Sequence, residues 1–165
     1  MPGNPIPTAL HDAIAAHRAL YLRTGGAQGH IILNAAAAGG LGFSTNLLIR
    51  YTGRKSGKSF VTPLSYGQLG GEVVIVASKG GADQNPIWYL NVRQSAAIEF
   101  QIATQAFRGS WREPVGAERE KVWNFMVECY AFYANYQAAT SRIIPVVMMT
   151  PIEEIPVFTE SVATV

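Results

Sequence analysis

Three strand-like segments separated by short, glycine-containing loops dominate the centre of the sequence. The segments are NLLIRYT (46–52), SFVTPLSY (59–66) and EVVIVAS (72–78), all rich in β-branched and aromatic residues. The loops between them have the length and glycine content of hairpin connections. We therefore expect a three-stranded antiparallel meander. Pro63 in the second strand predicts an edge or a bulge there, because proline cannot donate a hydrogen bond to a neighbouring strand.

A helical pattern precedes these strands. Thr8 can cap a helix that runs to about Arg23, with Leu10, Ile14 and Tyr21 on one face. The segment that follows, 27–44, is rich in alanine and glycine and lacks clear periodicity. It is expected to be a loop with a short helical piece.

Further strands and helices are predicted after the meander. Asn85-Pro86 supplies a cap and a first-turn proline for a short helix over 87–94. A longer helix from Ala117 has one apolar stripe: Val122, Phe125, Met126 and Cys129. The remaining strands are expected at 96–102, 105–111 and 145–150. Six strands with inserted helices indicate an α+β fold built on a small antiparallel barrel.

Length and composition favour one domain in an intracellular setting. A chain of 165 residues with 48% apolar side chains is expected to form a single domain over 1–165, with 1–44 as its N-terminal helix and variable segment. No apolar run reaches the roughly 18 residues of a membrane-spanning helix. The first residues lack the pattern of a secretory signal, and the lone Cys129 cannot form an internal disulfide, so we expect a cytoplasmic protein.

Charge is distributed unevenly along the chain. The net charge of +2 is too small to argue for nucleic-acid binding. No acidic residue lies between Asp12 and Glu72, and this stretch carries most of the cations discussed below: Arg18, Arg23, Arg50, Arg54, Lys55 and Lys58. Such a stretch either attracts an anion or serves only solubility.

Several familiar motifs are rejected. The run from Gly53 to Ser59 resembles a phosphate-binding P-loop, but it has three residues instead of four before Gly-Lys-Ser, and a strand follows where a helix is required. His11, His17 and His30 are scattered, so no metal site is expected. Cys129 lies on an apolar helix stripe, where a core role is favoured over nucleophilic catalysis.

Three tyrosines recur at intervals of three residues near the end of the longer helix. Tyr130, Tyr133 and Tyr136 flank Phe132. Such a stripe is often packing, but three hydroxyls are more polar groups than a dry core accepts easily. Packing and the lining of a cavity therefore both remain open.

Four sequence blocks together resemble the deazaflavin (F420)-dependent nitroreductase family. They are Y-T-G-R-K-S-G-K at 51–58, T-P-L at 62–64, V-A-S-K-G-G at 76–81 and N-P-I-W-Y-L-N at 85–91. The likeness runs from about Leu47 to Thr150, including R-I-I-P-V-V at 142–147, and is greatest to mycobacterial members. The resemblance implies a split antiparallel β-barrel of the FMN-binding type, with flanking helices, that holds coenzyme F420 with its oligoglutamate tail.

The resemblance also implies which residues meet the cofactor. Residues of the 53–58 turn would meet its phosphate and tail, residues of 60–65 its ring, residues of 76–79 the ring and linker, and residues of 87–91 would close the groove. The full set is Arg54, Lys55, Ser56, Gly57, Lys58, Phe60, Val61, Thr62, Pro63, Leu64, Ser65, Val76, Ala77, Ser78, Lys79, Ile87, Trp88, Tyr89, Leu90 and Asn91. The concentration of cations on one turn agrees with an anionic ligand.

The implied reaction is transfer of a hydride from reduced F420 to an electron-poor small molecule such as a quinone, an activated alkene or a nitro compound. Residues expected beside the substrate are Tyr66, Ser78, Tyr130, Tyr133 and Tyr136. One of these hydroxyls would polarise a substrate oxygen or guide a proton to it, unless solvent supplies the proton. The family pattern is altered at two places: Lys58-Ser59-Phe60 lacks one basic residue, and Ser95-Ala96 replaces Asn-Pro.

Two other functions compete with this one. An FMN-dependent split-barrel oxidoreductase would share the fold, and a carrier would bind a deazaflavin or lipid-like ligand without turnover. The partner is in each case a small molecule. The helix predicted over 8–23 would cover the pocket, pack on the barrel or rest peripherally on a membrane surface, and its weak amphipathicity favours packing.

Overall fold

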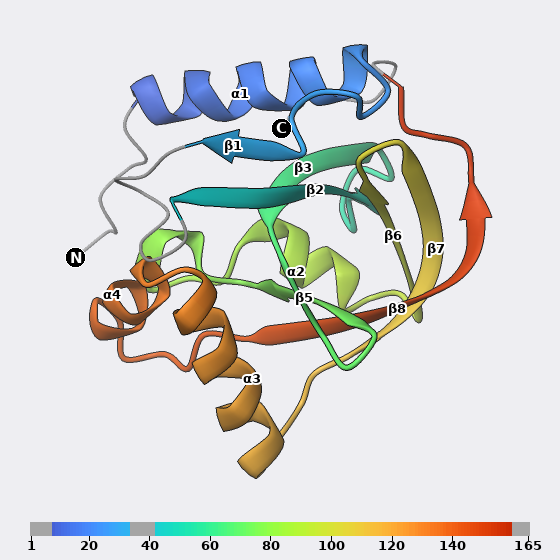
Figure 1. The fold of residues 1–165 in the computed structure, drawn as a ribbon. Coiled ribbons are helices and arrows are strands. Elements are labelled where there is room, and N and C mark those ends of the chain that lie inside the picture. The colour runs from blue at the N-terminus through green and yellow to red at the C-terminus, as the bar shows by residue number, and fades with distance from the viewer. Residues whose placement is uncertain (1–7, 34–41, 160–165) are drawn as a thin grey trace.

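The computed structural model describes residues 8–33 and 42–159, and their chain path is drawn in Figure 1. The helices are α1 (Thr8–Arg23), α2 (Ile87–Val92), α3 (Gly116–Cys129) and α4 (Phe132–Ala138), with a 3-10 turn η2 (Lys79–Gly81). The strands are β1 (Ile31–Leu33), β2 (Phe43–Thr52), β3 (Ser59–Ser65), β4 (Gly67–Leu69), β5 (Glu72–Val76), β6 (Ala97–Ile102), β7 (Gln105–Arg112) and β8 (Val146–Ile155).

All strand pairings of the described residues are antiparallel and join one large sheet. The order is β1-β2-β6-β7-β8-β5-β4, and β3 pairs with the other edge of β2. No pairing between described residues joins β3 to β4 or β5, so this sheet stays open. The structure is thus a mixed fold with a large open antiparallel sheet and few helices, and the split antiparallel barrel expected from the sequence is not confirmed.

The predicted meander is correct for its first hairpin and wrong for its third strand. β2 and β3 pair from Asn46 with Ser65 to Thr52 with Ser59. β5 instead pairs with the short β4 and with β8, which the sequence did not indicate. Three residues are too few for a periodic signal, which explains why β1 and β4 were missed.

Pro63 lies on an edge strand, as predicted. The Tyr66 N–H donates to the Thr45 carbonyl at 3.0 Å. Because hydrogen-bonded and non-hydrogen-bonded pairs alternate along an antiparallel ladder, Pro63 opposite Leu48 is in a non-hydrogen-bonded pair. Its nitrogen therefore faces away from β2, where no donor is needed.

Helix α1 has the predicted bounds and packs on the outer face of the sheet. Tyr21 is completely buried in a cluster with Leu48, Val61, Ala106 and Phe158. Its hydroxyl donates to the Asn46 carbonyl at 3.0 Å and accepts the Ala103 N–H at 2.7 Å. Ile14 stays exposed, so the expected apolar face is buried only toward the helix end. The expected cap at Thr8 and the side chain of Leu10 lie outside the described side chains.

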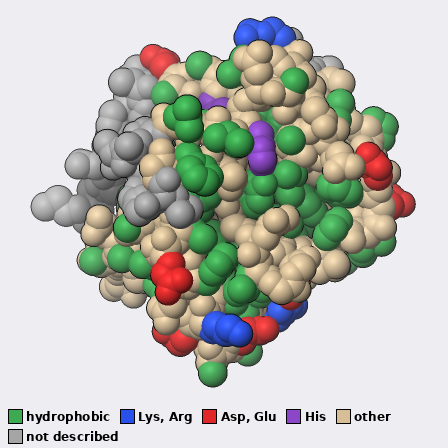
Figure 2. All heavy atoms as spheres, viewed as in Figure 1, with side chains coloured by type: hydrophobic (Ala, Val, Ile, Leu, Met, Phe, Trp, Pro, Cys, Tyr) green, Lys and Arg blue, Asp and Glu red, His purple; other side chains and the backbone are tan. Residues whose placement is uncertain are grey.

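The other helices cover two different faces of β5. Val73 and Ile75 pack in a core that includes Trp88 of α2, while Val74 and Val76 pack against α3 and α4. Figure 1 shows α1 on one side of the molecule and α3 with α4 on the opposite side. On the face shown in Figure 2, hydrophobic side chains gather over the middle and charged ones lie toward the margins.

Several predicted boundaries need correction. The segment expected as a loop over 27–44 contains β1 and the start of β2 where it is described, and 34–41 lies outside the described residues. Helix α2 ends at Val92, and Pro86 is its N-cap, with no side-chain cap from Asn85. Of the α3 stripe, Val122 and Met126 are buried, whereas Phe125 and Cys129 are only partly so. No helix in the described part is long and apolar enough to cross a membrane.

Candidate active site

The turn between β2 and β3 presents three cations to solvent. It is closed by the Gly53 N–H, which donates to the Lys58 carbonyl at 2.8 Å. A side chain at Gly53 would lie 2.8 Å from both the Phe60 ring and the Ser56 hydroxyl, so the close approach requires glycine. Arg54, Lys55 and Lys58 are exposed, and none of them forms an ion pair with another described residue.

Asn91 ties this turn to helix α2. Its side-chain oxygen accepts the Arg54 backbone N–H at 2.7 Å and a guanidinium N–H at 3.4 Å. Its amide nitrogen donates to the Ile87 carbonyl at 2.9 Å. Asn91 is buried, and its side-chain hydrogen bonds fix the basic turn relative to α2.

The other α2 residues divide between surface and core. Ile87 is exposed, while Trp88 and Tyr89 are buried. The Tyr89 hydroxyl donates to Glu113 at 2.6 Å. Burial, together with this bond to Glu113, raises the pKa of Tyr89 to about 12, so the phenol stays protonated.

Strand β3 offers alternating side chains to two environments. Phe60 and Leu64 pack at the margin of the core that contains α2, and Thr62 shares their face by alternation. Val61 is buried against the α1 cluster. Of the residues expected at the cofactor ring, Val61 thus has its side chain turned toward α1.

A single arginine fixes the backbone around Ser78. The guanidinium of Arg142 donates to the carbonyls of Ala77 at 3.2 Å, Ser78 at 2.7 Å and Ala82 at 2.7 Å, and to Asn85 Oδ1 at 2.9 Å. This loop includes Lys79 at the positive φ of 46°, which non-glycine residues adopt rarely. Burial lowers the pKa of Arg142, and the four acceptors offset that desolvation.

The tyrosine stripe packs beside this loop. A side chain at Gly81 would lie 2.7 Å from the Tyr136 carbonyl, so η2 and α4 are in close contact. The Tyr133 ring meets Tyr130 and Tyr136 edge-on, at centroid distances of 5.9 and 6.2 Å. Tyr136 is only half-buried.

The three tyrosine hydroxyls have different environments. Tyr130 is buried and its hydroxyl donates to the Tyr66 carbonyl at 2.8 Å. Tyr133 is also buried, which raises the pKa of its hydroxyl, and this hydroxyl forms no hydrogen bond with a described residue. Its oxygen is not fully enclosed, because every fully buried side-chain polar atom of the described residues has a partner. The Tyr130 hydroxyl is thus engaged in hydrogen bonds within the protein, whereas the Tyr133 hydroxyl forms none with a described residue.

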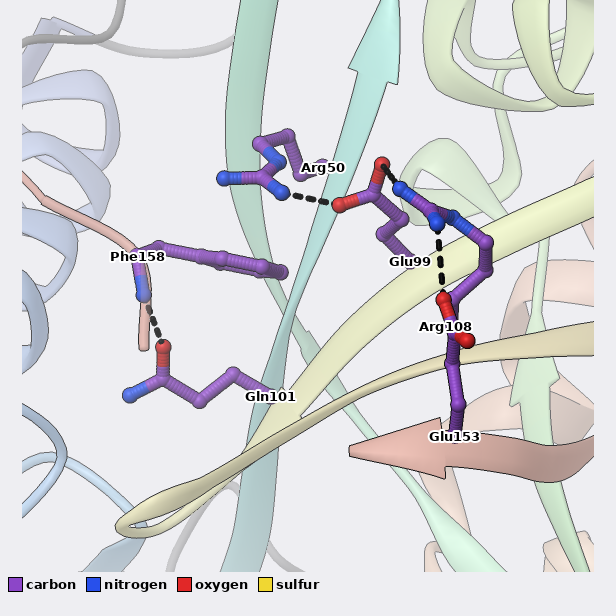
Figure 3. Close-up of polar contacts among 6 residues, drawn as sticks. All are labelled: Arg50, Glu99, Gln101, Arg108, Glu153 and Phe158. Atoms are coloured by element: carbon purple, nitrogen blue, oxygen red, sulfur yellow. Dashed lines mark hydrogen bonds and ion pairs between the residues drawn. The ribbon is translucent and has the colours of Figure 1, made fainter. Parts of the chain in front are cut away.

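The basic stretch does not form one continuous patch. Arg50 pairs with Glu99 on the outer sheet face, Glu99 also meets Arg108, and Arg108 pairs with Glu153 (Figure 3). Glu99 is the acidic partner of Arg50 among the described residues, and the Arg50 guanidinium also lies 4.4 Å from the Phe158 ring centre. Of the cations described in this stretch, Arg50 alone forms an ion pair; Arg54, Lys55 and Lys58 of the turn and Arg18 and Arg23 of α1 have no acidic partner among the described residues.

A cavity of about 380 Å³ borders the turn, and its lining includes Arg54 and Asn91. It continues along the outer face of the sheet past Arg50 and Glu99 to Arg108.

The sequence did not predict a role in the candidate site for two residues, Arg142 and His30. Arg142 falls inside a block that carries the family resemblance, so its position was a signal. His30, whose Nε2 lies 2.6 Å from the Tyr66 hydroxyl, was considered only as a metal ligand and has no local signal.

Comparison with known proteins places these features in one family. Residues 17–151 match the family model of the F420H2-dependent quinone reductases, a range from within α1 to within β8. The chain is 34% identical over 137 residues to an F420H2-dependent quinone reductase of Mycobacterium tuberculosis, covering 81% of this chain and 87% of that protein.

Solved structures agree with this match. An F420-H2 dependent reductase (FDR-A) has a TM-score of 0.58 at 39% identity, over 63% of this chain and 92% of its own. A second structure, a domain-swapped dimer, has a TM-score of 0.59 at 33% identity, over 87% of this chain and 99% of its own.

Proposed function

The chain belongs to the F420H2-dependent quinone reductase family, and on that premise we propose that it reduces quinones, activated alkenes or nitro compounds. It is an F420-dependent oxidoreductase, and coenzyme F420 is its cofactor. The family predicted from the sequence motifs is thereby confirmed. The choice among acceptors is our proposal, supported for quinones by the names of the relatives.

The observation that carries the proposal is the set of unpaired cations on the β2–β3 turn. A polyanionic tail needs positive charge that the protein has not already neutralised, and Arg54, Lys55 and Lys58 supply it. The residues present therefore fit the cofactor. The hydrogen bonds of the Asn91 side chain hold this turn beside α2, so the turn is already in place before the ligand binds.

We propose that the cofactor ring lies between β3 and the loop held by Arg142, in the manner of a split barrel. The Thr62 side chain and the backbone at Pro63 on the β3 side, and residues 76–79 on the loop side, would contact the ring. The bound cofactor supplies two electrons as a hydride. Arg142 keeps the loop in one conformation, so that Ser78 is positioned for each turnover.

The substrate would lie against the tyrosine stripe. Tyr133 has a hydroxyl without a partner among the described residues, and the adjacent Tyr136 is half-buried. A hydroxyl in this setting can donate a hydrogen bond to a substrate oxygen on which negative charge develops. The raised pKa of Tyr133 keeps it protonated for that role.

One experiment tests this function and its alternatives. The apo-protein is titrated with F420 and with FMN while fluorescence is followed, and menadione is then added to the complex with reduced F420. We expect tight binding of F420, weak binding of FMN and oxidation of reduced F420 by the quinone. Preferential binding of FMN would contradict the assignment of the turn cations to the anionic tail of F420. Binding of F420, with no oxidation of reduced F420 by any quinone, enone or nitro compound, would indicate a carrier.

A further inference from the structure

His30 and Tyr66 form a hydrogen-bonded pair at the edge of the tyrosine stripe. His30 Nε2 and the Tyr66 hydroxyl oxygen are 2.6 Å apart, and the rings stack with centroids 5.8 Å apart. The His30 carbonyl accepts the Asn46 N–H at 2.7 Å, which anchors the histidine backbone to β2. Tyr66 is buried and His30 is half-buried.

The pair is joined to the tyrosine stripe through Tyr66. The Tyr66 carbonyl accepts the Tyr130 hydroxyl at 2.8 Å and the Thr45 hydroxyl at 3.1 Å. Tyr130 in turn contacts Tyr133 edge-on. The backbone of Tyr66 is therefore tied to Tyr130, the first tyrosine of the stripe that we propose for the substrate, while His30 retains partial access to solvent.

The electrostatic setting favours neutral groups at rest. Burial lowers the pKa of His30 and raises the pKa of Tyr66. Three other described residues act on this pair. Tyr130 further raises the pKa of Tyr66, a hydrogen bond with Thr45 lowers it, and Tyr21 of α1 interacts with Tyr66. With both groups neutral, we assign the proton of this bond to the phenol, which then donates to Nε2.

We propose that His30 and Tyr66 form a proton-delivery pair that protonates the substrate oxygen. His30 takes a proton from solvent, and its Nε2–H then donates to the Tyr66 oxygen. Tyr66 passes its own proton to the reduced substrate oxygen as the His30 N–H bond breaks, which restores neutral histidine and phenol. The substrate gains a hydride, two electrons with one hydrogen, from reduced F420, which is oxidised, and the second hydrogen arrives as the proton that comes from solvent through the pair. This inference rests on the proposed function.

The first test uses the apo-protein and needs no turnover. Nitrogen-15 NMR of the imidazole reports which ring nitrogen carries the proton. We expect neutral His30 to be protonated at Nδ1, with Nε2 accepting from the phenol. Tyr66→Phe should shift the His30 ring toward the Nε2–H form, while Tyr51→Phe, which removes the hydroxyl of another buried tyrosine, should leave it unchanged. Identical His30 spectra in wild type and Tyr66→Phe would show that His30 and Tyr66 do not form the proposed hydrogen-bonded pair.

The second test measures the reaction. His30→Gln and Tyr66→Phe should each lower kcat at least about tenfold with menadione, while F420 affinity stays within about twofold. Delivery requires protonated His30, so wild-type kcat should fall as pH rises through the lowered pKa of His30, and His30→Gln should remove this dependence. Unchanged kcat, or an unchanged pH profile in His30→Gln, would refute the proposal. A wild-type protein that neither binds F420 nor transfers a hydride from reduced F420 to menadione would instead refute the proposed function. The NMR result would still show whether His30 and Tyr66 are hydrogen-bonded.

Discussion

A single partly buried cation can order a loop that has little regular structure. The residues from Ala77 to Asn85 contain one 3-10 turn and an unfavourable backbone angle at Lys79. Arg142, which is distant in sequence, donates hydrogen bonds to carbonyl oxygens of this loop. Arginine suits this role because its planar guanidinium donates in several fixed directions. Lysine at the same place would satisfy fewer acceptors.

We therefore predict that Arg142→Lys lowers the free energy of unfolding by about 2 kcal/mol, the scale of lost charge-assisted hydrogen bonds. It should also lower kcat, because Ser78 loses its support. Urea denaturation measures the first effect and steady-state kinetics the second. Arg108→Lys serves as the control: its exposed pair with Glu153 should contribute little. Equal stability of both variants would contradict the role of Arg142.

Tyr133 and Tyr130 provide a matched pair of hydroxyls. Tyr133→Phe should lower kcat more than cofactor affinity and leave stability nearly unchanged, because its hydroxyl has no described partner to lose. Tyr130→Phe should destabilise the fold by about 1 kcal/mol, since its hydroxyl bonds with Tyr66 and Thr45. Thermal unfolding and kinetics on both variants check this. A larger loss of F420 affinity than of kcat in Tyr133→Phe would place that residue against the cofactor.

At the scale of elements, the β2–β3 hairpin combines a rigid frame with a charged tip. Arg54→Ala with Lys55→Ala should weaken F420 binding at low salt by ~2 kcal/mol or more, because charge-assisted contacts are lost. The backbone bond from residue 54 to Asn91 remains possible in this variant, so the turn should keep its shape. Fluorescence titration gives the affinity, with exposed Lys121→Ala on α3 as the control. Wild-type affinity in the folded double variant would contradict the assignment.

Elements with strong local signals were predicted closely, and the others depended on distant contacts. Helix α1 has its predicted bounds because Gly25 and Gly26 end it with positive φ angles. Helix α4 was missed as an element because its aromatic residues are explained equally well by any packed segment. The pairing predicted for the third meander strand was wrong because β5 pairs with β8, which is more than sixty residues away in sequence.

The same distinction applies to the candidate site. The turn cations and the α2 block lie in continuous motifs and could be recognised from them. Contacts such as His30 with Tyr66, or Arg142 with Ser78, join residues far apart in sequence, and a single sequence contains no rule for that proximity.

At the scale of the whole molecule, the C-terminal segment returns across the sheet to α1. Phe158 is only 1% exposed, its N–H donates to the buried Gln101 at 2.8 Å, and Arg50 lies over its ring (Figure 3). Phe158→Ala should lower the free energy of unfolding by about 3 kcal/mol through loss of this buried ring. F420 affinity in the folded fraction should not change. Urea denaturation tests the first statement, and a loss below about 1 kcal/mol would show that the segment is not part of the core.

Pro63 has a consequence for how copies of the chain meet. An exposed strand edge normally offers a row of amide donors on which a strand of another molecule can add, and this is a common start of aggregation. At the outer edge of β3 the proline nitrogen interrupts that row. The edge is therefore poorly suited to recruit a foreign strand, which keeps it accessible to a small flat molecule without inviting self-association.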